Sequence, residues 1–151
     1  MYCYEFEKFS CTVDIIVINP QPSVEEDKIL LVKRKNEPYK NYLSLPGGFI
    51  EAAEHPAESA AREVFEETGL EVQVSRLLEA SAPGRGINVV IIFYEAHPIG
   101  GKLVPGDDAS DARSFKQHEL PTNIAFDLHR QIIHRWFKQR SESKISGRIS
   151  D

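Results

Sequence analysis

Three glutamates stand close together in one short segment, and their spacing is the first feature of the sequence that could do chemistry. Glu66 and Glu67 follow Glu63 by three and four residues, so on a helix the three carboxylates project from one side. The arrangement is unfavourable by itself, because like charges at this spacing repel and the last turn of a helix prefers cations. Each effect is worth about 0.3 to 1 kcal/mol, and both act in the same direction.

A hard divalent cation would remove this repulsion. Mg²⁺ and Mn²⁺ favour carboxylate and water oxygens and commonly serve substrates that carry phosphates, so the cluster predicts a metal site. The alternative is a solvated acidic helix face, which is what most glutamate-rich helices present to water. The nonapeptide from Arg62 to Leu70 does not by itself separate these two interpretations.

Residues upstream of the cluster favour the metal site. The stretch from residue 48 to residue 70, which we call the glutamate motif, reads Gly48-x5-Glu54-x7-Arg62-Glu63-Val64-x-Glu66-Glu67-x-Gly69-Leu70. At every fixed position it resembles the signature of the Nudix hydrolases, G-x5-E-x7-R-E-U-x-E-E-x-G-U, in which U is a bulky aliphatic residue. A pattern with so many specified positions is very unlikely to arise by chance.

The resemblance implies a fold, a reaction and a cofactor. The fold is α+β, an α/β/α sandwich in which helices flank a mixed central sheet. The reaction is the hydrolysis of a nucleoside diphosphate linked to another moiety, in which a water attacks one phosphorus. Mg²⁺ or Mn²⁺ would neutralise the pyrophosphate oxygens and lower the pKa of a bound water. By the pattern of the family, Glu63, Glu66 and Glu67 would face the metal, and the Gly47 carbonyl would be a backbone ligand.

Three further residues complete the expected catalytic set. Arg62 lies four residues before Glu66 and can hold a carboxylate with two hydrogen bonds, which would orient a ligand. The resemblance implies that Glu54 supports the loop and the metal cluster. Many family members supply one more acidic group from a later loop, and here we prefer Asp108 among the aspartates of residues 106–111. A solvated turn is the alternative for these aspartates.

The substrate is indicated by segments outside the motif. Residues 81–86, 112–115 and 119–121 resemble the ADP-ribose and NADH pyrophosphatase branch of the family. Members of the NADH branch commonly carry a zinc ribbon, which this chain lacks because its only cysteines are Cys3 and Cys11. ADP-ribose or a related nucleotide sugar or dinucleotide is therefore the leading substrate.

Three side chains are candidates for holding that substrate. Arg85 lies on a glycine-flanked loop and could contact a phosphate or a ribose. Phe49 and Tyr42 could stack on the base or flank its pocket. The alternatives are a solvent-facing arginine in a turn and aromatic rings that only pack.

Two other functions compete with this one. The first is a pyrophosphohydrolase that removes oxidised nucleoside triphosphates. The second belongs to another class: a non-catalytic nucleotide-sensing Nudix module of the kind fused to a DNA-binding domain. The sensing module is disfavoured because every carboxylate of the motif is present, and we expect no DNA-binding domain after the last helix.

A helix and several strands must position these residues. The helix is predicted over Pro56–Thr68, with a proline in its first turn and Gly69 where it ends. A second amphipathic helix is predicted over Ala125–Arg140. A sharp loop is expected at Pro46-Gly47-Gly48, and the first two strands are expected to pair. The predicted strands are Thr12–Ile18, Ile29–Arg34, Leu43–Leu45, Glu71–Ala80, Asn88–His97 and Ala112–Gln117.

Length and composition set the remaining expectations. The chain has 151 residues, 41% of them hydrophobic, which predicts a single domain over residues 1–140 and a flexible tail over 141–151. The 18 lysines and arginines against 23 aspartates and glutamates give a net charge of −5, which argues against nucleic-acid and membrane partners. No signal sequence or membrane span is recognised. The two cysteines match neither a C-x-x-C pair nor a zinc pattern, so a reduced, cytoplasmic protein is expected. The resemblance also allows a homodimer, which no residue requires.

Overall fold

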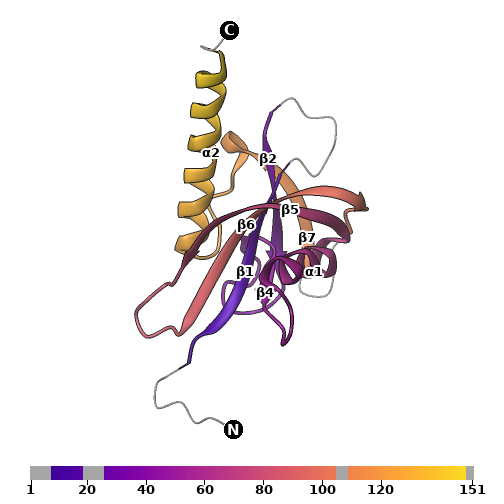
Figure 1. The fold of residues 1–151 in the computed structure, drawn as a ribbon, viewed down its shortest axis with the longest axis vertical. Helices are drawn as coiled ribbons and strands as arrows, with labels where there is room; N and C mark the ends of the chain where they lie inside the picture. Colours follow the sequence, from indigo (N-terminus) through magenta and orange to yellow (C-terminus); the bar gives the residue numbers. More distant parts are fainter. Residues whose placement is uncertain (1–7, 19–25, 105–108, 149–151) are drawn as a thin grey trace.

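The computed structural model describes residues 8–18, 26–104 and 109–148, and these form two sheets and two long helices (Figure 1). The helix α1 lies beside β4, and α2 runs along the other side of the molecule. In chain order the elements are β1 (Ser10–Val17), β2 (Lys28–Arg34), β3 (Leu43–Ser44), β4 (Gly47–Phe49), α1 (Pro56–Thr68), β5 (Leu70–Ser81), β6 (Val89–Gly101), β7 (Ala109–Lys116), the short 3₁₀ helix η1 (Gln117–Glu119) and α2 (Asp127–Arg148).

The strands divide into two sheets. One has the order β4-β1-β6-β5 and is mixed, since β1 runs parallel to β6, and the other has the order β3-β2-β7 and is antiparallel. Alternate residues of β1 and β2 enter two separate core clusters, one with side chains of α1 and the other with side chains of α2. The strands are therefore sandwiched between the helices, and the predicted fold class is confirmed.

The predicted pairing of the first two strands is wrong. β1 lies between β4 and β6, and β2 lies between β3 and β7. Within the described residues, which exclude 19–25, an isolated bridge between Ile18 and Ile29 is the only backbone pairing that joins them. Both strands carry fully buried residues on both faces, which is the pattern of central strands with a neighbour at each edge rather than of an isolated hairpin.

The loop expected at the two glycines is instead the short strand β4. Val13 of β1 is opposite Gly48, and Asp14 is opposite Gly47. A Cβ atom at Gly47 would lie 2.1 Å from the carbonyl oxygen of Val13 and 2.1 Å from Asp14 Oδ1. Glycine is required here because the two backbones approach each other too closely for a side chain.

The helix α1 has the predicted bounds, Pro56–Thr68. It begins with a capping box, in which His55 Nδ1 accepts from the Ala57 N–H at 3.2 Å and Glu58 Oε2 accepts from the His55 N–H at 3.2 Å. It ends at Gly69, whose φ of 76° is left-handed and whose N–H donates to the Phe65 carbonyl. Both ends are fixed, so the positions of the three glutamates along the helix are fixed too.

The second helix is longer than predicted. Its apolar face is buried, as expected of an amphipathic helix, and includes Ile133, Trp136 and Phe137. The helix then continues to Arg148, so residues 141–148, where we expected a tail, are helical. One reason is an ion pair at 2.8 Å between Lys144 and Asp27, which lies just before β2.

Asp27 holds the C-terminal half of α2 and predicts a pH effect. Arg140 donates to both carboxylate oxygens at 2.8 and 2.9 Å, and these hydrogen bonds lower the pKa of Asp27 from 3.8 to about 2. The stabilisation is complete above about pH 4 and is lost as the pH falls through about 2, because the folded-state pKa is the lower one.

We therefore expect Asp27→Asn to lower the free energy of unfolding at pH 7 by about 1 to 2 kcal/mol. Denaturant titrations of both proteins at several pH values measure this difference. The difference should shrink between pH 4 and pH 2, where the wild-type carboxylate becomes protonated. The control is Asp111→Asn, since Asp111 is half exposed and pairs with Arg113 at 3.4 Å, and it should change stability little.

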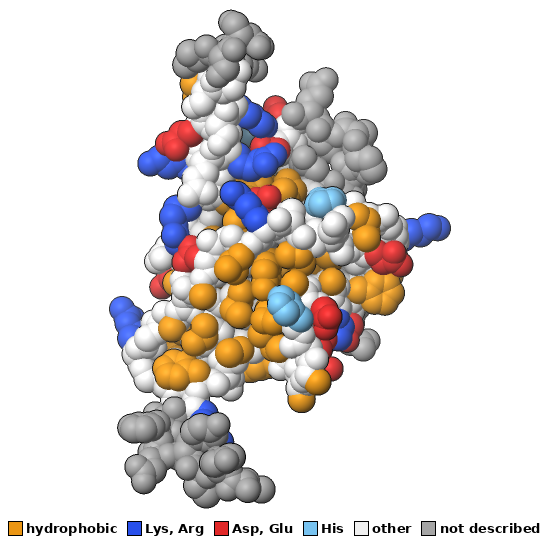
Figure 2. Space-filling model, in the orientation of Figure 1, with side chains coloured by type: hydrophobic (Ala, Val, Ile, Leu, Met, Phe, Trp, Pro, Cys, Tyr) orange, Lys and Arg blue, Asp and Glu red, His pale blue; other side chains and the backbone are white. Residues whose placement is uncertain are grey.

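One face of the surface is apolar at its centre (Figure 2). Hydrophobic side chains gather over the strands on this face, while positive and negative side chains mix along α2 rather than forming a single basic area. No helix in the described part of the chain is long and apolar enough to cross a membrane.

Candidate functional site

The site is built where two glutamates of α1 meet β4. Glu63 and Glu67 are only 9% and 8% exposed, which is unusual for carboxylates. The N–H of Gly47 donates to Glu67 Oε2 at 3.1 Å. A Cβ atom at Gly48 would lie 2.5 Å from Glu63 Oε1. The two glycines therefore let the backbone of β4 lie directly against the carboxylates of α1.

Arg62 is the centre of the charge network. It grips Glu54 with two hydrogen bonds, at 2.7 Å from Nε and 3.0 Å from Nη2. Its Nη1 donates to Glu63 at 3.0 Å and to Glu66 at 3.1 Å. The expected two-bond grip is present, but its partner is Glu54, whereas Glu66 receives a single bond. These contacts raise the pKa of Arg62, and the hydrogen bond to Glu54 contributes most to the rise.

Glu54 fastens the turn that precedes α1. Besides Arg62, its carboxylate accepts from the N–H of Glu51 at 2.9 Å and from Ser59 Oγ at 2.7 Å. The hydrogen bonds of Arg62 and then of Ser59 lower its pKa to about 2. Arg62 Nη2 also donates to the Phe49 carbonyl at 3.1 Å. One guanidinium thus joins the end of β4, the turn and α1.

The residues fit a hard divalent cation in their chemistry. Glu54, Glu63, Glu66 and Glu67 carry four formal negative charges and Arg62 carries one positive charge, which leaves a net charge of about −3 for a cation to offset. All the donors are carboxylate or backbone oxygens, the kind that Mg²⁺ and Mn²⁺ prefer. Among the described residues, which exclude 105–108, no three acidic, histidine or cysteine side chains converge closely enough to enclose an ion.

The other predicted residues lie in three separate places. Asp108 falls outside the described residues. Arg85 is exposed, with a φ of 57°, in the turn between β5 and β6, which Figure 1 shows far from α1. Phe49 ends β4 and is 61% exposed. Tyr42 belongs to a different group, since its ring lies 5.4 Å from that of Tyr39. The structure therefore does not bring Arg85, Phe49 and Tyr42 together.

Two residues that the sequence did not single out also reach this site. His129 of α2 accepts from the Leu45 N–H at 3.3 Å through Nδ1, and its Nε2 lies 2.9 Å from Asp14 Oδ2. An aspartate inside the apolar run of β1 was a usable signal, because a buried carboxylate needs a partner. Nothing in the spacing of the histidines indicated His129.

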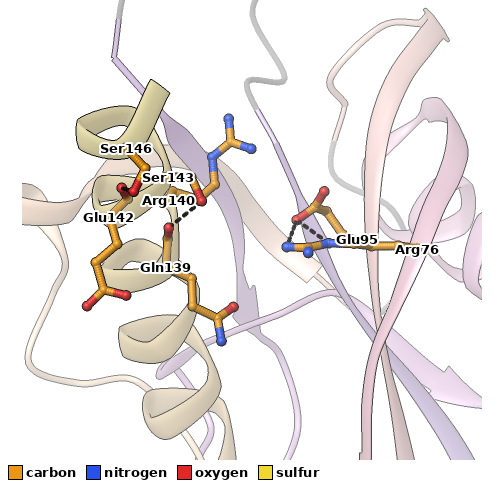
Figure 3. Close-up of a pocket in the computed structure, with 7 residues that line it drawn as sticks. All are labelled: Arg76, Glu95, Gln139, Arg140, Glu142, Ser143 and Ser146. Atoms are coloured by element: carbon orange, nitrogen blue, oxygen red, sulfur yellow. Dashed lines mark hydrogen bonds and ion pairs between the residues drawn. The ribbon is translucent and has the colours of Figure 1, made fainter. Parts of the chain in front are cut away.

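A cavity of about 810 Å³ lies elsewhere, between α2 and the strands β5 and β6 (Figure 3). The buried Glu95 accepts there from Trp136 Nε1 at 2.6 Å and from Arg76 Nη2 at 3.0 Å. These bonds tie α2 to the sheet and satisfy the carboxylate. None of the lining residues comes from the glutamate motif or β4. The candidate metal site, which those two segments form, therefore lies outside this cavity. The lining residues are Arg76, Glu95, Gln139, Arg140, Glu142, Ser143 and Ser146.

Comparison with known proteins identifies the family. The model of the NUDIX domain matches residues 9–137. The chain belongs to the Nudix family. The family membership expected from the glutamate motif is therefore confirmed, and the motif is the Nudix box of this chain.

Two sequence relatives and one solved structure show which proteins this Nudix chain resembles. An ADP-ribose pyrophosphatase of Methanocaldococcus jannaschii is 42% identical over 120 residues, which cover 78% of this chain and 70% of the relative. The ADPR responsive transcriptional repressor NtrR of Acinetobacter baylyi is 33% identical over 128 residues, covering 78% of this chain and 49% of the repressor. A NUDIX hydrolase from Nitrosomonas europaea has the same fold, with a TM-score of 0.79 and 29% identity, covering 91% of this chain and 75% of the other.

Proposed function

We propose that this Nudix protein hydrolyses the pyrophosphate bond of a nucleoside diphosphate linked to a second moiety, with ADP-ribose as the leading substrate. The observation that carries the proposal is the placement of the two buried glutamates of α1 against the Gly47–Gly48 backbone. The 42% identity to an ADP-ribose pyrophosphatase supports the substrate.

In this proposal the Nudix box holds Mg²⁺ or Mn²⁺. Glu63, Glu66 and Glu67 would supply carboxylate oxygens, and Gly47 would supply its carbonyl. The bound metal supplies charge neutralisation at the pyrophosphate and a water of lowered pKa. Arg62 keeps Glu63 and Glu66 in place through Nη1. Asp108 remains our candidate for the additional acidic group.

The aromatic group that includes Tyr42 is the proposed contact for the base. The rings of Tyr39 and Phe126 lie 5.1 Å apart, and Tyr42 packs against Tyr39. Tyr39 and Tyr42 are 46% and 41% exposed, so a flat base can stack on them. Arg34 lies over the Phe126 ring, 5.0 Å from its centre. Phe49 and Arg85 stay predicted substrate contacts from other parts of the surface.

The products of hydrolysis test the proposal. The purified chain is incubated with ADP-ribose, NADH, nucleotide sugars and oxidised nucleoside triphosphates in the presence of Mg²⁺. We expect fastest turnover of ADP-ribose to AMP and ribose 5-phosphate. Release of inorganic pyrophosphate from a triphosphate would favour the sanitising activity instead. Tight ADP-ribose binding without products would favour the sensing module, which the similarity to a repressor keeps as the second candidate.

Metal binding is also expected to stabilise the fold. A ligand that binds only the folded chain at 100 times its Kd adds about 2.7 kcal/mol, which corresponds to a rise in Tm of roughly 5 to 10 °C. Thermal unfolding with and without Mg²⁺ at equal ionic strength measures the shift, and a chelator should reverse it and abolish turnover. An unchanged Tm at all Mg²⁺ concentrations would contradict the proposed metal site.

The remaining expectations concern the partners, the cellular location and the oligomeric state of the protein. A nucleotide substrate is proposed as its partner, and the net charge of −5 argues against nucleic acid. A cytoplasmic location and a homodimer stay predictions.

A further inference from the structure

The strongest unexplained feature is a buried polar chain that connects α2 to β4. His129 is 3% exposed and lies at the start of α2, among apolar neighbours. An imidazole in such a position costs free energy unless both ring nitrogens have partners. Both have partners here: the Leu45 N–H at 3.3 Å and Asp14 Oδ2 at 2.9 Å.

The two hydrogen bonds define the tautomer of the ring. Because Nδ1 accepts from the backbone N–H of Leu45, the proton lies on Nε2, which donates to Asp14. The ring is held edge-on to Phe93 and tilted against Phe126, with centroid distances of 5.9 and 5.1 Å. The direction of both hydrogen bonds is therefore fixed by packing.

Both partners of His129 border the segment that carries the proposed backbone ligand. Leu45 is two residues before Gly47, and Asp14 is opposite Gly47 in the β1–β4 pair. The carboxylate of Asp14 lies so close that a Cβ atom at Gly47 would be 2.1 Å from Oδ1. On the other side, the Gly47 N–H donates to Glu67. The segment Leu45–Gly48 is thus fixed from one side by Asp14 and His129 and from the other by α1.

We infer that Asp14 and His129 form a positioning pair that sets the conformation of the Leu45–Gly48 segment and thereby the affinity of the site for its divalent cation. The inference rests on the proposed function. Neither residue is a catalytic residue, because each acts through the backbone of Leu45 or Gly47. Outer partners of this kind typically change metal affinity or activity by roughly 10- to 100-fold.

The test uses His129→Leu, which keeps an apolar side chain in the core and removes both hydrogen bonds. The Mn²⁺ dissociation constant is measured on the purified full chain by electron paramagnetic resonance, together with the apparent kcat and KM for ADP-ribose at an Mg²⁺ concentration well below the wild-type dissociation constant. We expect the Mn²⁺ dissociation constant to rise and kcat to fall, each by roughly 10-fold or more, with KM for the nucleotide within about 2-fold. In metal-free protein the Leu45 amide should exchange its hydrogen faster.

A second variant keeps the inference testable if the first one folds poorly. His129→Asn places an amide oxygen near the position of Nδ1, so it can still accept from the Leu45 N–H. We expect it to recover part of the Mn²⁺ affinity that His129→Leu loses. Asp14→Ala in the His129→Leu background should add little further loss, because two residues that act as a pair are not additive.

Ile133→Ala is the matched control for a general loss of stability. Ile133 is one helical turn further along α2 and fully buried, but it belongs to the apolar core, so it should lower the Tm and leave the Mn²⁺ dissociation constant unchanged. The inference is overturned if folded His129→Leu binds Mn²⁺ as the wild type does, if His129→Asn recovers nothing, or if Ile133→Ala weakens Mn²⁺ binding equally. Failure of the wild-type chain to bind Mn²⁺ would overturn the proposed function, and this inference with it.

Discussion

Glu67→Gln is expected to reduce kcat by about 10³-fold, equivalent to about 4 kcal/mol of transition-state stabilisation, while the chain stays folded. The substitution removes one negative charge from a site that is only 8% exposed. An amide oxygen at the same place can still accept from the Gly47 N–H, which Glu67 Oε2 contacts at 3.1 Å. The fold of β4 against α1 is thus preserved, and the loss reports on the charge. Steady-state hydrolysis of ADP-ribose and thermal unfolding measure the two effects.

The result separates a metal site from a solvated acidic helix. If Glu67 only faces solvent or packs, the neutral variant should be as active as the wild type and at least as stable, because one repulsive charge is gone from the last helical turn. The control is Glu142→Gln, which makes the same chemical change on exposed α2 and should leave kcat unchanged. Loss of the Mg²⁺-dependent rise in Tm in Glu67→Gln would support the metal role; full activity would refute it.

Local signals were enough to predict the helix that carries the site. Proline is favoured in the first turn of a helix and glycine just after its last residue, so Pro56 and Gly69 gave the bounds of α1. The apolar face of α2 was equally readable, because Trp136 and Phe137 follow Ile132 and Ile133 by four residues, which is helical spacing, and all four are buried. The ends and the apolar face of a helix depend on residues close together in the chain, so they can be predicted from the sequence.

Pairing between elements could not be predicted in the same way. The first two strands were expected to pair, but Ile15, Ile16 and Leu31 are fully buried, and such strands take neighbours from distant parts of the chain. The strand β4 forms because it pairs with β1 at the edge of the sheet. A Gly-Gly pair in the sequence does not indicate this pairing. The end of α2 depends on Asp27, more than a hundred residues away.

In the candidate site, too, the local features could be predicted from the sequence and the long-range contacts could not. The Nudix box placed Glu63, Glu67 and Arg62 correctly on one helix, because their spacing is local. The two-bond partner of Arg62 is Glu54, which lies eight residues earlier and faces the helix only because the intervening turn folds back. The contact of His129 with Leu45 spans 84 residues, and no pattern in the sequence indicates it.

Arg62→Ala is expected to damage both stability and activity. Its side chain is 22% exposed, and its guanidinium holds Glu54, Glu63 and Glu66 at once. Its removal takes the positive charge from among four carboxylates, so we expect the free energy of unfolding to fall by about 2 kcal/mol. We expect kcat to fall by roughly 10- to 100-fold, because the carboxylates proposed to hold the metal lose their orientation.

Arg62→Lys separates the contribution of the positive charge at residue 62 from that of its hydrogen-bond geometry. A lysine restores the positive charge, but a single ammonium cannot make two parallel bonds to Glu54 and also reach Glu63 and the Phe49 carbonyl. If geometry matters, Arg62→Lys should recover stability better than activity. The control is Arg135→Ala, which breaks an ion pair with Glu79 at 2.8 Å on the surface and should change neither kcat nor Tm appreciably. If Arg62→Lys were as active as the wild type, charge alone would explain Arg62, and its grip on Glu54 would have no part in catalysis.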